Sequence, residues 1–148
     1  MNLIDLKYLW TKSTLNKIYI LFTLFMGLFF LFSLVAKVME IDQWLDFNYE
    51  LTDNKIGYVN GIVILLIELY FSISFLLLKI SRNLLILCFA FILFLTIFVL
   101  SNKDLFKSCM CFGSLIVMKP DFSFIFKNSF LLFSIILIYI FNVKIKNV

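Results

Sequence analysis

Four long apolar runs divide this chain, and each is long enough to cross a lipid bilayer as a helix. A spanning helix needs about 20 mostly apolar residues, whereas a spanning strand needs an alternating segment of about ten, and these runs do not alternate. Helices also satisfy their own backbone hydrogen bonds inside lipid. The sequence therefore predicts an all-α membrane protein, an antiparallel bundle of four transmembrane helices. The helices are expected at about residues 18–38, 60–78, 83–100 and 124–143.

The composition also indicates helices in lipid. Of the 148 residues 64% are hydrophobic, against about half in soluble domains, and the mean hydropathy is +1.08. Twenty Phe, one Pro and four Gly leave little material for turn-rich loops. The length allows a single domain, residues 1–148. The first run is longer than the apolar core of a signal peptide and no A-x-A cleavage site follows it, so we expect a retained helix.

Lysine and arginine are distributed slightly unevenly between the two sides of such a bundle. With an even number of spans both termini share a side, which has seven basic residues against six on the other side. The positive-inside rule then predicts both termini in the cytoplasm. Anionic lipid headgroups are sufficient partners for the net charge of +4, so no nucleic acid is expected. The seven are Lys7, Lys12, Lys17, Lys79, Arg82, Lys144 and Lys146.

An N-terminal segment and two outer loops complete the predicted layout. Residues 1–17 form an amphipathic segment suited to the membrane interface. Residues 37–60 form the first outer loop, which carries five acidic residues, and residues 101–123 form the second. Aromatic residues of the first loop are expected to let it rest on the headgroup layer. These are Trp44, Phe47 and Tyr49.

Two cysteines one residue apart, Cys109 and Cys111, lie in the second outer loop. In a strand their Cα atoms would be about 6.6 Å apart, near the upper limit for a disulfide, and in a helix their side chains would point apart. A disulfide between them therefore needs a local turn, to which Gly113 lends backbone freedom. Such a bond would be strained and exchangeable. The pair suggests thiol–disulfide chemistry at the extracytoplasmic face, where disulfides persist.

Other interpretations of the cysteines remain open on spacing alone. Cys109 and Cys111 would also suit a pair of free, buried and inert thiols. A zinc site is disfavoured, because the chain has no His and a structural zinc takes four nitrogen or sulfur ligands. Cys88, inside the third apolar run, is expected to be a packing residue. No metal and no cofactor are predicted.

Glu68 is the one charged residue well inside a predicted span. A carboxylate at mid-membrane costs about 2.5–3.5 kcal/mol on insertion scales, so such a residue usually faces the bundle interior and has a partner. One interpretation is a proton donor and acceptor coupled to the thiols, and the other is a neutral residue hydrogen-bonded to a neighbouring helix. Lys127, near the start of the fourth run, should extend its amine toward water. The expected partners of Glu68 are Thr23, Thr96, Ser72 or a tyrosine.

The string Cys109-Met110-Cys111-Phe112-Gly113 resembles the C-x-C-F-G signature of the MauE/DoxX family of redox-associated membrane proteins. The resemblance extends from about residue 20 to 142, although Ser108 and Met110 replace the Asp and Gly that the family often has. It implies a four-helix bundle in a bacterial cytoplasmic membrane. The further matching positions are Gly27, Phe30, Ser33 and Lys37 in the first helix, Glu68, Leu69 and Arg82 around the second, and Lys119, Pro120 and Asp121 before the last.

The resemblance also implies a role class. MauE members are similar to factors that mature methylamine dehydrogenase, a disulfide-rich periplasmic enzyme, by supplying or reshuffling disulfides. We therefore predict a membrane thiol–disulfide oxidoreductase with Cys109 and Cys111 as the catalytic pair, supported by Glu68, Gly113 and Lys37. It would relay disulfides or reducing equivalents to a thioredoxin-like or secreted partner. The alternative is a non-catalytic small subunit or assembly factor of a larger membrane complex.

Overall fold

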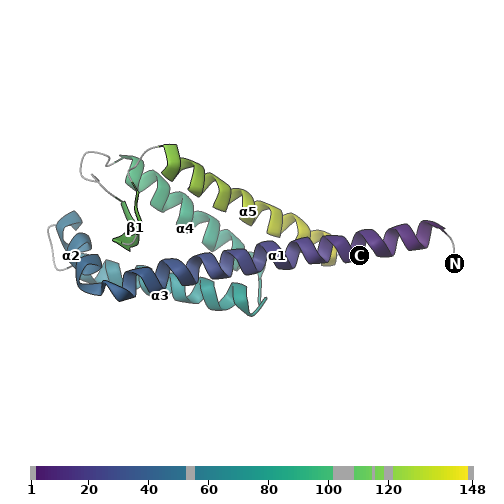
Figure 1. Cartoon of the computed structure of the whole chain (residues 1–148), viewed down its shortest axis with the longest axis horizontal. Coiled ribbons are helices and arrows are strands. Elements are labelled where there is room, and N and C mark those ends of the chain that lie inside the picture. The colour runs from purple at the N-terminus through teal and green to yellow at the C-terminus, as the bar shows by residue number, and fades with distance from the viewer. Residues whose placement is uncertain (1–2, 53–55, 102–108, 115, 119–121, 147–148) are drawn as a thin grey trace.

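Four long helices form the body of the protein in a computed structural model (Figure 1). The structure describes the backbone of residues 3–52, 56–101, 109–114, 116–118 and 122–146, and the side chains of residues 16–50, 56–101 and 124–143. Helix α1 packs against α3 and α5, and α5 also packs against α4. The long helices are α1 (Leu3–Met39), α3 (Ile56–Leu76), α4 (Arg82–Ser101) and α5 (Phe122–Lys146).

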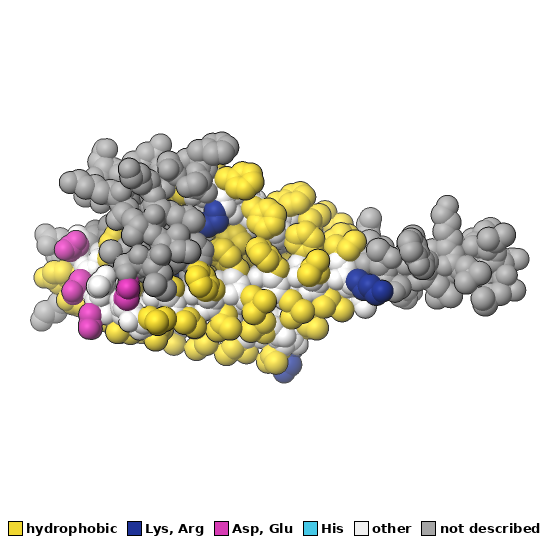
Figure 2. Space-filling model, viewed as in Figure 1, with side chains coloured by type: hydrophobic (Ala, Val, Ile, Leu, Met, Phe, Trp, Pro, Cys, Tyr) yellow, Lys and Arg dark blue, Asp and Glu magenta, His cyan; other side chains and the backbone are white. Residues whose placement is uncertain are grey.

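Each long helix contains a stretch that is long and apolar enough to cross a membrane. Large hydrophobic side chains face outward along the bundle, among them Leu21, Phe94 and Phe126. They cover most of the visible surface of its middle part (Figure 2). The predicted four-helix transmembrane bundle is confirmed. The four stretches are Asn16–Met39, Ile56–Leu76, Arg82–Ser101 and Phe124–Val143.

The core contains side chains from all four long helices, including many aromatic rings. Phe30 of α1 contacts Phe71 and Phe75 of α3, with ring centroids 5.3 and 6.2 Å apart. Phe71 in turn meets Phe91 of α4 edge-on at 5.6 Å. Such aromatic pairs contribute about 0.5–1.5 kcal/mol beyond their area burial. Cys88 of α4 is fully buried in the same core as a free thiol, which is the packing role expected of it.

The start of α1 and the end of α5 lie at one end of the bundle, called here the terminal end (Figure 1). Near this end the Asn142 Nδ2 donates to the Tyr19 hydroxyl and to the Ile80 carbonyl, at 3.5 and 3.4 Å. An amphipathic segment suited to the membrane interface was expected at residues 1–17, of which the structure describes residues 3–17. They form the first part of α1, continuous with its membrane-spanning stretch, and project beyond the other helices.

The first predicted loop is largely helical. Residues Ile41–Thr52 form α2, which folds back against α3, so the sequence-based loop of residues 37–60 is wrong. Trp44 is buried and Phe47 packs against the ends of α4 and α5, rather than both resting on headgroups. The acidic residues Asp42, Asp46 and Glu50 of α2 are exposed, and Asp42 lies in the first turn, where the helix dipole favours an acid. Figure 2 shows acidic side chains gathered at this end.

A two-stranded antiparallel hairpin lies at the same end, which we call the hairpin end. Strand β1 (Cys109–Ser114) pairs with β2 (Ile116–Met118). The backbone of β1 contacts both α1 and α2. Figure 1 shows the hairpin opposite the terminal end of the bundle. This part of the chain was predicted to be a loop, residues 101–123.

Helix α3 ends in a Schellman motif with leucine where glycine is usual. The Lys79 N–H donates to the Ser74 carbonyl and the Leu78 N–H to the Phe75 carbonyl, at 3.0 and 3.1 Å. Leu78 has a φ of 55°, in the left-handed region that disfavours residues with a Cβ. Helix α4 then begins with Ser81 as its N-cap, whose Oγ accepts from the Leu84 N–H at 3.1 Å.

Replacing Leu78 with glycine is expected to raise the free energy of unfolding by about 1 kcal/mol, because glycine adopts a positive φ without the Cβ penalty. The Leu78 side chain is 43% exposed, so its loss should cost little. Unfolding in mixed detergent–SDS micelles measures the change. Leu78→Ala is the matched control, since it removes the same side chain and keeps the Cβ. A glycine variant no more stable than the alanine variant would contradict the prediction.

Candidate functional site

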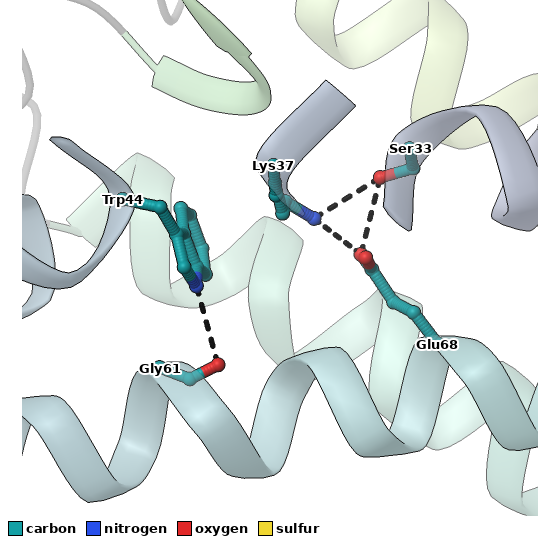
Figure 3. A network of polar contacts seen from close by, with 5 residues as sticks. All are labelled: Ser33, Lys37, Trp44, Gly61 and Glu68. Atoms are coloured by element: carbon teal, nitrogen blue, oxygen red, sulfur yellow. Dashed lines mark hydrogen bonds and ion pairs between the residues drawn. The ribbon is translucent and has the colours of Figure 1, made fainter. Parts of the chain in front are cut away.

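A buried ion pair joins α1 to α3. The Lys37 ammonium bonds to Oε1 of Glu68 and also donates to the Ser33 Oγ at 3.0 Å. The Ser33 hydroxyl donates to the same Glu68 oxygen at 3.2 Å. Lys37 and Glu68 are 3% and 4% exposed, so both charges are out of water. Figure 3 shows the three side chains converging between the two helices.

This cluster lies closer to the hairpin end than the position of Glu68 in its span suggests. Glu68 is in the middle of α3, but its partners Ser33 and Lys37 are in the last two turns of α1. The reason is that the first turns of α3 extend past the end of α1 and pack against α2 instead. The carboxylate is therefore level with the last turns of α1.

Trp44 of α2 lies over the ion pair. The Lys37 Nζ is 4.9 Å from the centroid of the Trp44 indole, a cation–π contact. The indole N–H donates to the Gly61 carbonyl of α3 at 3.2 Å, which fixes the ring (Figure 3). Gly61 has no side chain that would push α2 away, and a Cβ there would be 3.1 Å from Leu45 Cδ2. The contact between α2 and α3 thus holds an aromatic ring over the charges.

A second cation comes from α5. Lys127 interacts electrostatically with both Lys37 and Glu68. Its ammonium lies over the Phe124 ring, 5.2 Å from the centroid, and the residue is half-buried, so the extension of its amine toward water stays a prediction. One residue on, the Asn128 Nδ2 donates to the Thr96 Oγ1 of α4 at 2.9 Å. Charged and polar residues from all four long helices therefore meet at this level of the bundle.

One oxygen of the buried carboxylate is not used by these contacts. Lys37 and Ser33 both bond to Oε1 of Glu68, whereas Oε2 is buried and has no hydrogen-bond partner among the residues that the structure describes. Leaving a buried polar atom unsatisfied costs about 1–3 kcal/mol, and more for a charged group. Such an atom is a position where a proton, a water or another donor would bind favourably.

The cysteine pair lies in β1, and the strand is irregular at that point. Cys109 is opposite Met118 and Phe112 is opposite Ile116, so β1 has one more residue than β2 between these pairs. The extra residue is a β-bulge, which bends the strand and re-aims side chains. The side chains of Cys109 and Cys111 lie outside the described residues. Gly113 follows in the same strand.

The backbone places the cysteines at the same end of the bundle as the charges. Strand β1 contacts α2 and α1, and α1 carries Lys37 in its last turn. Figure 3 shows the hairpin ribbon above this turn. Lys103 and Lys107, the basic residues that precede the cysteines in the sequence, lie outside the described part of the chain. So do Lys119, Pro120 and Asp121.

Glu68 is buried and paired with another helix, as expected, but its partners differ from the predicted ones. Its partners are Lys37 and Ser33, not Thr23, Thr96 or Ser72, and Ser72 instead donates to the Gly27 carbonyl at 3.2 Å. The available signal was the spacing of Ser33 and Lys37, because residues four apart share a helix face. Trp44 was assigned to the membrane surface because its helix was taken for a loop.

Comparison with known proteins gives one result. The family model described as "Methylamine utilisation protein MauE" matches residues 15–141. Neither a curated protein nor a solved structure matches the chain. The matched range includes every residue of the charged cluster and both strands of the hairpin.

Proposed function

This chain belongs to the family of the methylamine utilisation protein MauE, and from that membership and its site we propose that it is a membrane thiol–disulfide oxidoreductase. Cys109 and Cys111 form the catalytic pair and alternate between dithiol and disulfide at the extracytoplasmic face. A thioredoxin-like or secreted protein exchanges disulfides with them. The family name supports a role in maturing an enzyme of methylamine utilisation, in a bacterial cytoplasmic membrane.

The bulge in β1 is the observation that carries the proposal. A regular strand would hold the Cα atoms of Cys109 and Cys111 about 6.6 Å apart, near the limit for a disulfide. A bulged strand bends and so brings flanking residues closer. The bulge falls between Cys109 and Phe112, the stretch that holds the pair. A bond formed there would be strained and therefore readily exchanged.

The charged cluster supports the proposed orientation. Lys37 was counted among the six basic residues of the outer side, but it is buried and paired with Glu68. Without it the positive-inside count favours the terminal end as cytoplasmic more clearly, seven basic residues against five. Both termini then lie in the cytoplasm. The hairpin end, with Cys109 and Cys111, lies outside.

Equilibration of the full-length protein in liposomes with glutathione buffers tests the function. The wild-type pair is expected to convert reversibly between dithiol and disulfide, and a membrane-impermeant maleimide should label it from the hairpin side after mild reduction. Cys111→Ser should instead accumulate a mixed disulfide with glutathione at Cys109. The reverse variant, Cys109→Ser, should accumulate it at Cys111.

Cys88→Ser is the matched control, because Cys88 is buried in α4 and should leave the titration unchanged. The proposal fails if the maleimide never reaches Cys109 or Cys111 after reduction, or if the two never join. In that case a stoichiometric partner that copurifies with the cysteine-free protein would instead support the non-catalytic subunit.

A further inference from the structure

We propose that Glu68 is the proton acceptor for the thiols of Cys109 and Cys111, and that Oε2 is the atom that takes the proton. This inference rests on the proposed thiol–disulfide function and adds a residue and an atom to it. In this arrangement Lys37 and Ser33 are positioning residues that hold the carboxylate in place.

The two oxygens of Glu68 have different surroundings. Oε1 accepts from Lys37 and Ser33, so the orientation of the carboxylate is fixed. Oε2 is buried and, within the described part of the chain, bonds to no donor. A general base needs one oxygen that is free to accept a proton. Hydrogen bonds to the other oxygen keep the carboxylate in a fixed orientation. The asymmetry of the cluster meets both needs.

The surroundings single out Glu68 among the acids of the hairpin end. Asp42, Asp46 and Glu50 of α2 are exposed, and within the described side chains Glu68 is the buried carboxylate. The charged groups that face it are Lys37 from α1 and Lys127 from α5. Helix α2 presents the uncharged Trp44 to the cluster. Since β1 packs on α1 and α2, the strand that carries the thiols lies at the same end of the bundle as the carboxylate and contacts the helix that carries Lys37 and Ser33.

Oxidation of the cysteine pair requires one further reactant, the disulfide of the partner. One thiol of the pair gives its proton to Glu68 Oε2, directly or through one water, and the thiolate attacks the partner's disulfide. The partner's S–S bond breaks, a mixed disulfide forms, and the released partner sulfur takes a proton back from Glu68. The second thiol repeats the sequence and closes the Cys109–Cys111 bond. Two electrons and two protons pass to the partner, which leaves as a dithiol.

Glu68→Gln tests this role, because glutamine keeps the shape and an acceptor for Lys37 but cannot take the proton. The probe is oxidised glutathione, reacting with the reduced full-length protein in liposomes. The oxidation rate at pH 7 should fall by at least about tenfold, since general base catalysis contributes about 100- to 10,000-fold. The rate should approach the wild-type rate at high pH, where hydroxide replaces the base. The equilibrium between dithiol and disulfide should not change, because a base accelerates both directions.

Ser72→Ala is the matched control, one turn away on α3 and also hydrogen-bonded to α1. It should leave the rate and the pH profile unchanged, and Glu68→Asp should recover part of the rate. If Glu68→Gln does not fold, the solvent isotope effect on the oxidation rate of the wild type provides the test. A normal effect supports a base that removes the proton. An inverse effect, as for attack by a free thiolate, overturns the proposed role of Glu68. A wild-type pair that cycles, with a Glu68→Gln variant that cycles equally fast, refutes this inference alone. A wild-type pair that does not cycle refutes the proposed function.

Discussion

Replacing Lys37 with methionine is expected to lower the free energy of unfolding by about 3–5 kcal/mol, because it leaves the buried Glu68 without its cation. Methionine has nearly the length of lysine, so packing against Trp44 is largely kept. The loss therefore reports the uncompensated carboxylate rather than a cavity. Unfolding in mixed detergent–SDS micelles measures it, with the folded fraction followed by tryptophan fluorescence.

The double variant Lys37→Met with Glu68→Met separates charge from packing. Replacing both members of a buried pair by apolar residues of similar volume is often neutral or stabilising, so most of the lost stability should return. The free energy of unfolding should still be below that of the wild type, because the double variant lacks the cation–π contact with Trp44, which contributes about 0.5–2 kcal/mol. Lys79→Met, at an exposed lysine, is the control for the substitution itself and should change little. A double variant as unstable as the single one would show that packing, not charge, caused the loss.

The membrane bundle could be predicted from the sequence because its signal is strong and local. An uncharged run of about 20 apolar residues has few stable structures other than a membrane-spanning helix. The four spanning stretches, Asn16–Met39 among them, depend on composition along one segment and not on contacts between segments. The same reasoning located Glu68, because a carboxylate in such a run needs an explanation.

The end of the bundle could not be predicted in the same way, because its structure depends on contacts between segments. The acidic residues of α2 suggested a solvated loop, but Trp44 and Asn48 bury one face of the helix against α3. That packing makes α3 extend past α1 by several turns. This offset between α1 and α3 brings Lys37 level with Glu68. No local sequence pattern predicts it.

The structure around the cysteine pair could likewise be predicted only in part. Its spacing and position before the last helix were visible in the sequence, and so was the need for a distorted backbone between Cys109 and Cys111. The form of that distortion was not. A local turn was expected, whereas the chain forms a hairpin whose register gives β1 one extra residue. The register of a strand depends on the strand with which it pairs, so it cannot be predicted from the residues of one segment alone.

Gly27→Ala is expected to lower the free energy of unfolding by about 2 kcal/mol, within the range for over-packed interiors. A Cβ at Gly27 would lie 2.9 Å from Leu76 Cδ2 and Cγ and 3.0 Å from the Leu76 backbone nitrogen. The backbone nitrogen cannot swing aside as a side chain does, so α1 and α3 must separate. Close approach through small residues is what holds helices together in lipid. The loss is net of a gain in helix propensity of about 1 kcal/mol.

Two further variants decide whether the close approach is the cause. Leu28→Ala changes the next residue of α1, which is 57% exposed to lipid, and should have little effect. Leu76→Ala combined with Gly27→Ala removes the side-chain part of the clash but keeps the backbone part, so stability should recover only in part. Separation of α1 from α3 would also stretch the bond between Lys37 and Glu68, so Gly27→Ala should slow the oxidation of Cys109 and Cys111 as well. A Gly27→Ala protein with wild-type stability would show that the two helices tolerate a wider spacing, and the ion pair would then not depend on their contact.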